Sequence, residues 1–239
     1  MSGAKLLDEF LAIKDRGSHR SHKRLAKIIR EAYPIGVPAM IMKSSTDRLG
    51  ASAGYSFHLG TPDDLLRRVA SWLLTKAESD HRVLCKLIPL LWERHGREDV
   101  ALAALLLANI DHESLGTNPW EILASSINPS EPAEALLLSI EELARAGHSM
   151  PTKEMLRTWC RGRLVDSHLA LFSIHATRKL GGEVDEEIID LLDSVEIPDG
   201  DSLLRRIRER VVSSLSLIHI SEPTRPRRIA YAVFCLKKK

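Results

Sequence analysis

Thr61-Pro62-Asp63-Asp64 is the clearest helix start in the chain. It combines a hydroxyl residue that can cap, a proline suited to the first turn and two acids that favour the positive end of the helix dipole. Similar starts recur, and every second one falls at residues 61, 96, 130, 166 and 200, a helix-pair spacing of about 35 residues. The other starts are Ser79-Asp80, Gly96-Arg97-Glu98, Asn118-Pro119, Ser130-Glu131-Pro132, Pro151-Thr152, Asp166-Ser167, Glu183-Val184-Asp185 and Gly200-Asp201.

The segments between these starts are amphipathic at helical spacing. Leu136, Ile140 and Leu143 form one such stripe, and Leu171 and Ile174 lie on another. Alternating strand patterns are nearly absent. We therefore predict an all-α fold, a HEAT-like α-solenoid of stacked antiparallel helix pairs with a concave binding surface. A non-repeating helical bundle is the alternative, because no repeated sequence motif accompanies the spacing.

The last 25 residues, 215–239, differ in kind from the rest. Leu215 to Arg225 resembles the conceptual translation of a transposon-type short-read sequencing adapter, and Ile229 to Leu236 resembles the flow-cell end of the same adapter. The closing lysine run fits a poly-A stretch. We expect this tail to be an artefact that joins a truncated reading frame, with residues 1–214 forming a single domain. The alternative is a genuine C-terminal strand with a basic tip.

Charge is distributed unevenly along the chain. Without the tail, 28 Lys and Arg stand against 31 Asp and Glu, so the total charge predicts neither a nucleic-acid nor a membrane partner. Residues 1–50 hold ten basic and five acidic side chains, whereas residues 51–214 hold 18 and 26. The positive charge is thus concentrated in the helices expected at the N-terminus.

Several classes of protein are disfavoured by the sequence. The longest apolar run, Val100 to Ala108, is far shorter than the roughly 20 residues of a membrane span. The N-terminus has no apolar signal core. Cys85 and Cys160 are widely separated and show no zinc-ligand spacing. We expect a cytoplasmic monomer without a metal, a cofactor or a membrane partner.

One basic helix near the N-terminus is a candidate DNA-binding surface. At 100° per residue its cations form one narrow stripe, opposite Leu25, Ile28 and Ile29. The stripe consists of Arg20, Lys23, Lys27 and Arg30, with Arg16 and Arg24 beside it. A row of cations on a docked helix can follow phosphates without reading bases. A solvated outer face is the alternative interpretation.

Three stretches of the chain carry a further pattern. Phe57 to Arg68 combines an aromatic residue, Leu-Gly, Pro and a basic helix entry. Leu91-Trp92 followed by Glu98 to Ala104 combines Leu-Trp, an acidic turn and a small-residue helix. These stretches resemble the DNA alkylation repair family, bacterial alkylpurine DNA glycosylases built from HEAT-like repeats, and Asn118 to Ile122 falls where that family places a Trp-Trp-Asp type segment. The resemblance covers residues 55–180.

The resemblance implies an enzyme that releases alkylated purines from duplex DNA. Such a site needs a carboxylate and aromatic faces beside the sugar, on which positive charge develops. Trp120 and Trp159 are the candidate groove aromatics, and Glu121 is the candidate catalytic carboxylate, since no acid stands at the family's Asp position. The alternative roles are core packing for the tryptophans and a favourable helix-dipole contact for Glu121.

We therefore expect a DNA-binding helical-repeat protein similar to these glycosylases, with its catalytic activity left open. The missing Asp and the negative charge of residues 51–214 favour a second hypothesis, a non-enzymatic scaffold for protein–protein interaction. An active glycosylase that uses Glu121 is the third. The lesion and the protein partner are not specified by these patterns.

Overall fold

The structure, a computed structural model, confirms the all-α class. It describes residues 2–14, 17, 20–49, 54–199 and 201–213, so Arg16 and the tail 215–239 lie outside the described residues. Within these ranges every regular element is a helix, and the β-bridge between Phe57 and Gly96 is isolated. The helices are α1 (Gly3–Ala12), α2 (His22–Ala32), α3 (Ala39–Leu49), α4 (Asp63–Ala77), α5 (Arg82–Arg94), α6 (Arg97–Asn109), α7 (His112–Leu115), α8 (Pro119–Ser126), α9 (Ala133–Arg145), α10 (Lys153–Cys160), α11 (Leu164–Lys179), α12 (Glu186–Asp193) and α13 (Ser202–Ser213).

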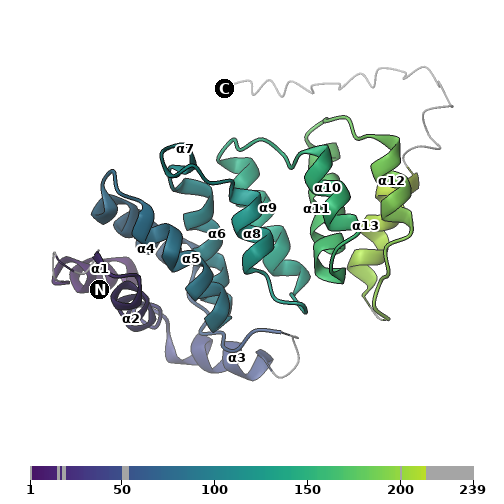
Figure 1. The fold of residues 1–239 in the computed structure, drawn as a ribbon. Helices are drawn as coiled ribbons and strands as arrows, with labels where there is room; N and C mark the ends of the chain where they lie inside the picture. The colour runs from purple at the N-terminus through teal and green to yellow at the C-terminus, as the bar shows by residue number, and fades with distance from the viewer. Residues whose placement is uncertain (1, 15–16, 18–19, 50–53, 200, 214–239) are drawn as a thin grey trace, which may run out of the picture.

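The helices are arranged in two rows (Figure 1). In the first row α1, α4, α6, α9, α11 and α13 contact one another in that order. In the second row α2 contacts α5, α5 contacts α8, and α10 contacts α12. A ring contact between Trp120 and Trp159 joins α8 to α10. From α4 onward the long helices alternate between the rows, so helices of one row run in the same direction.

Most helices begin where the sequence predicts. Asn118 and Thr152 accept backbone N–H groups of the helices that follow them, and Asp185 caps α12 in the same way. Thr61 is an exception, because Pro62 takes the N-cap position and the Thr61 hydroxyl donates to the carbonyl of Tyr33, 2.9 Å away. The predicted capping role of Thr61 is therefore wrong, although the helix start is right.

The core is centred on α6, a first-row helix that packs against helices of both rows. Eleven of its thirteen residues are buried, including the acids Glu98 and Asp99, both 0 % exposed. This helix is buried on nearly all sides because α4, α5, α8 and α9 all pack against it. Residues 165–174 of α11 are buried in the same manner. A helix that is apolar all round is typical of a buried position between layers.

Two polar networks tie separate helices together around this core. The Tyr33 hydroxyl donates to Asp99, 2.8 Å away, and Arg94 contacts both that carboxylate and the carbonyl of Ala26. These bonds join α2 to α5 and α6. In the second network Arg67 of α4 forms an ion pair with Glu142 of α9 at 2.5 Å, and α6 packs against both of these helices.

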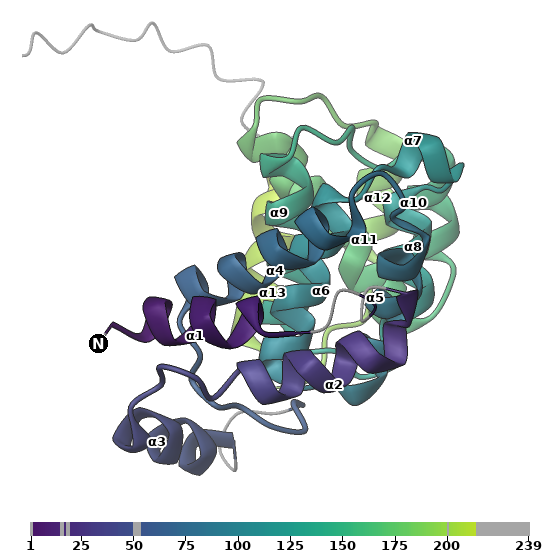
Figure 2. The ribbon, with the colours of Figure 1, turned by 90° about the vertical axis from the view of Figure 1, so that its left-hand side faces the viewer.

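The N-terminal helices close one end of the rows. Figure 2 shows α1 and α2 side by side at this end, with α3 standing apart from the rows. Ser2 and Ser21 cap α1 and α2 by accepting the N–H groups of Lys5 and Arg24. The buried residues of α2 face α5, so its opposite side is directed away from the core.

Candidate functional site

The basic face of α2, formed by Lys23, Arg24, Lys27 and Arg30, is the predicted DNA-binding surface. All four side chains are exposed. The opposite side of the helix is buried, through Leu25, Ala26, Ile28, Ile29 and Ala32. The helix is amphipathic as the sequence predicts, and its cations face outward.

Two further predicted cations do not extend this face. Arg20 precedes the N-cap residue Ser21, so it lies outside the helix, and the helical spacing assumed for it does not apply. Its side chain borders a surface hollow of about 380 Å³ together with Glu78 and Asp80, at the turn between α4 and α5. Arg16 lies outside the described residues.

The acid on α2, Glu31, is already engaged. Lys14 Nζ donates to its carboxylate at 2.9 Å, and this hydrogen bond is the main cause that lowers the pKa of Glu31. The positive charges of Lys14 and Lys27 lower it further. Lys14 Nζ also lies 3.9 Å from the centroid of the Phe10 ring. Lys14 therefore stabilises the contact between α1 and α2.

Trp120 and Trp159 meet, but inside the protein. Their ring centroids are 6.3 Å apart, and the side chains are only 3 % and 7 % exposed. Trp120 Nε1 donates to the carbonyl of Ser149 at 2.8 Å, as a buried indole requires. At this burial little of either ring face is open to a sugar, although Trp159 lines the same cleft as Glu121. They pack α8 against α10.

Glu121 is exposed in the first turn of α8, next to the capping residue Asn118. It borders a cleft of about 640 Å³, which is also lined by Trp159 and by the ion-paired Arg163 and Asp166. A carboxylate in contact with bulk water gives little stabilisation to a developing positive charge. Among the described residues no group of three His, Cys, Asp or Glu side chains is placed to hold a metal ion.

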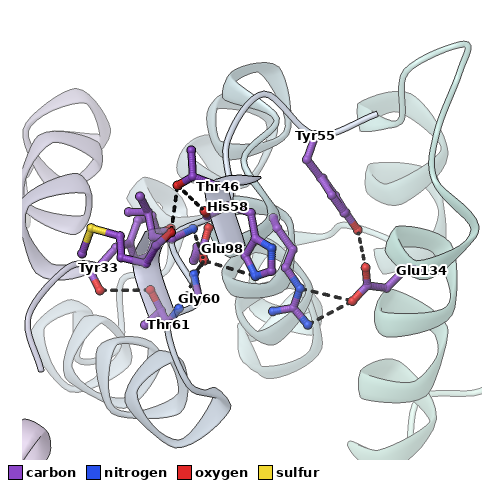
Figure 3. Close-up of polar contacts among 11 residues, drawn as sticks. Tyr33, Thr46, Tyr55, His58, Gly60, Thr61, Glu98 and Glu134 are labelled. Atoms are coloured by element: carbon purple, nitrogen blue, oxygen red, sulfur yellow. Dashed lines mark hydrogen bonds and ion pairs between the residues drawn. The ribbon is translucent and has the colours of Figure 1, made fainter. Parts of the chain in front are cut away.

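Sequence reasoning missed a buried polar cluster around Glu98, drawn in Figure 3. The Glu98 Oε1 atom accepts the N–H groups of Leu59 and Gly60 at 2.9 Å each and that of Thr61 at 3.3 Å. His58 Nε2 lies 4.0 Å from the same oxygen. Gly60 has a φ of +76°, a left-handed conformation that helps to direct three successive N–H groups toward one carboxylate. The cluster fixes the segment before α4 onto α6.

Neighbouring contacts extend this attachment to the start of α6. The Tyr55 hydroxyl donates to Glu134, 3.4 Å away, and Arg97 donates to the same carboxylate at 2.9 Å (Figure 3). The ring of Phe57 lies so close to Gly96 that a Cβ there would be 2.0 Å from its Cζ. These contacts stabilise the fold and leave no space for a substrate at Gly96.

The apolar run Val100 to Ala108 is the signal that could have revealed the Glu98 cluster. A helix buried all round places even its first-turn acids away from water, where they require hydrogen-bond partners. By itself, Gly96-Arg97-Glu98 indicates only the start of a helix.

Comparison of the chain with family models, curated proteins and solved structures found no match. In the described part of the chain, no helix has the length and apolar character needed to cross a membrane.

Proposed function

We propose that this protein is a HEAT-like helical-repeat protein, related to the alkylation-repair glycosylases, that binds the backbone of duplex DNA without catalysis. The observation that carries the proposal is the basic face of α2, whose cations are exposed while its apolar side is buried. The alternation of helices between two rows supports the repeat architecture. The buried tryptophans and the exposed Glu121 argue against base release.

The dimensions of the basic face fit contact with phosphates. Lys23 and Arg30 are seven residues apart, which is about 10 Å along a helix axis. That length corresponds to about three base-pair steps of roughly 3.4 Å each. Each phosphate that a cation neutralises contributes about −0.9 to the slope of log affinity against log salt. The four cations of the basic face therefore imply a slope of about −3 to −4.

Charge removal tests this proposal. In the variant Lys23→Gln/Lys27→Gln/Arg30→Gln, the affinity for a labelled duplex, measured by fluorescence anisotropy between 50 and 200 mM salt, should fall. The salt slope should become shallower by about 2 to 3. A matched variant, Lys86→Gln/Arg161→Gln/Arg205→Gln, removes the same charge from exposed sites elsewhere in the protein and should bind nearly as well as wild type. Equal weakening by both variants, or no binding by wild type, would refute the proposal.

A protein–protein scaffold is the second candidate function. It is favoured by α12, at the opposite end of the second row, where Glu186, Asp190 and Asp193 are exposed. A negatively charged surface repels DNA and suits a basic protein partner. Absence of duplex binding by the wild-type protein would favour this function.

A further inference from the structure

A groove on the surface of the first row is not used by either proposed function. It lies between α9, α11 and α13, has a volume of about 610 Å³, and falls within the usual size range of ligand sites. Each helix contributes apolar residues at helical spacing. The apolar floor is formed by the half-buried Leu137, Ala176 and Leu203, which lie over the buried side chains of Ile140, Phe172 and Ile207.

One end of this groove is cationic. Toward their C-terminal ends α9, α11 and α13 contribute Arg145, Lys179 and Arg210, which all border the groove. The hydrogen bond from Arg178 to the carbonyl of Val211 shows that the ends of α11 and α13 lie together. The three cations therefore gather where the apolar floor ends.

The charges around the groove do not cancel. One acid, Glu141, borders the groove. The cation Arg145 is paired with Glu142, and Glu142 also binds Arg67. Among the described residues, Lys179 and Arg210 have no hydrogen-bond or ion-pair partner. Their positive charges, after burial, lower the pKa of His175 between them.

Cations at helix C-termini also balance the helix dipole, which explains one cation per helix. The dipole does not explain why an apolar groove leads to them. Nor does it explain Leu180, a large apolar side chain at the mouth of the groove that is 68 % exposed. An apolar floor with a cationic end suits a ligand that has an aliphatic chain and an anionic head.

We propose that this groove binds a single-chain aliphatic carboxylate. The chain lies over the half-buried Leu137, Ala176 and Leu203, and the carboxylate lies between Lys179 and Arg210. From Phe172 to Lys179 the groove extends about 10 Å along α11, which limits the length of chain that it covers. Each methylene that enters the groove should tighten binding by about fourfold, up to that length.

Calorimetric titration of the full chain with hexanoate, octanoate, decanoate and dodecanoate, each below its micelle concentration, tests the site. Affinity should rise along the series and then level off. In Lys179→Gln/Arg210→Gln the affinity for dodecanoate should fall about three- to tenfold, the range expected for two partly exposed charge contacts. The matched variant Lys23→Gln/Lys27→Gln should bind dodecanoate as wild type does.

Two further measurements test where dodecanoate binds and which head-group charge the groove prefers. Dodecanoate should shift the ring resonances of His175, assigned with His175→Gln, and dodecyltrimethylammonium should bind more weakly than dodecanoate. Equal affinity for the two amphiphiles, no binding of dodecanoate, or unchanged affinity in Lys179→Gln/Arg210→Gln would overturn the proposal. The Lys23 and Lys27 variant separates this site from the DNA-binding surface, so each proposal can fail without the other.

Discussion

The first turns of α6 and α8 show the same sequence signal in two different environments. Each turn carries acidic side chains, Glu98 and Asp99 in α6 and Glu121 in α8, where negative charge favours the helix dipole. In α6 the surrounding helices bury both acids, and each has specific partners. In α8 the acid is exposed. The packing around a helix start, more than its local sequence, therefore determines what an acid there does.

The largest loss of stability should come from removing the buried carboxylate of Glu98. Glu98→Ala leaves the N–H groups of Leu59, Gly60 and Thr61 without their acceptor and opens a cavity. We expect the free energy of unfolding, measured by urea denaturation, to fall by about 3 to 5 kcal/mol. Glu98→Gln should lose less, because its amide oxygen can still accept. A loss below 1 kcal/mol for Glu98→Ala would show that the buried Glu98 contributes little more to stability than the exposed Glu121.

A second change tests how tightly the start of α6 is packed. In Gly96→Ala the new Cβ would meet the ring of Phe57, and we expect a loss of about 1 to 3 kcal/mol in the free energy of unfolding. Combining it with Phe57→Leu should give a smaller loss than the sum of the two single changes. Strict additivity in this double-mutant cycle would show that the ring and Gly96 are not in contact.

The Tyr33 hydroxyl provides a third test, through Asp99. Tyr33→Phe removes one bond to a buried carboxylate and should lower the free energy of unfolding by about 1 to 2 kcal/mol at pH 7. Burial, with the charge of Asp99 in addition, raises the pKa of Tyr33 well above its usual value. The folded protein therefore keeps this phenol protonated at a pH where the unfolded chain ionises, about 10.

This pKa difference gives the pH dependence a definite sign. The stability that the protonated Tyr33 phenol contributes to the folded state is fully present below about pH 10, the pKa of the unfolded chain. It is lost as the pH rises from there toward the raised pKa of the folded protein. Urea unfolding at pH 9 to 11 should show wild type losing stability more steeply than Tyr33→Phe. Identical pH dependence in the two proteins would contradict the burial of the phenol.

The smallest effect is expected at α8. Because Glu121 is exposed, Glu121→Gln should change the free energy of unfolding by less than about 0.5 kcal/mol. We also expect no release of alkylated purines from methylated duplex DNA by the wild-type protein. Base release by the wild-type protein that disappears in Glu121→Gln would instead show that this exposed acid is catalytic.

The helix starts could be predicted because capping is a local interaction. Asn118, Thr152 and Asp185 each bond to a backbone N–H two or three residues away, and the sequence contains both partners. The predicted start at Asp166 was late for the same reason. Asp166 accepts the N–H of Arg163 from inside α11, so it marks the third helical residue and not the cap.

The candidate site could not be predicted in the same way, because it depends on distant neighbours. Helical spacing correctly separated the cations of α2 from its apolar face, but it could not show that Ser21 begins the helix after Arg20. The burial of Trp120 and Trp159 depends on α8 packing beside α10. Nothing in either local sequence distinguishes a packed indole from one that borders an open groove.

The ion pair between Arg67 and Glu142 has a consequence for how the molecule unfolds. In the proposed architecture of stacked helical repeats, each unit contacts only its neighbours, so the ends can unravel while the middle persists. This pair joins α4 to α9 across α6, and its partners are 75 residues apart in sequence. Helices α4 to α9 should therefore open as one cooperative block, whereas α12 and α13, beyond that link, are free to unravel first.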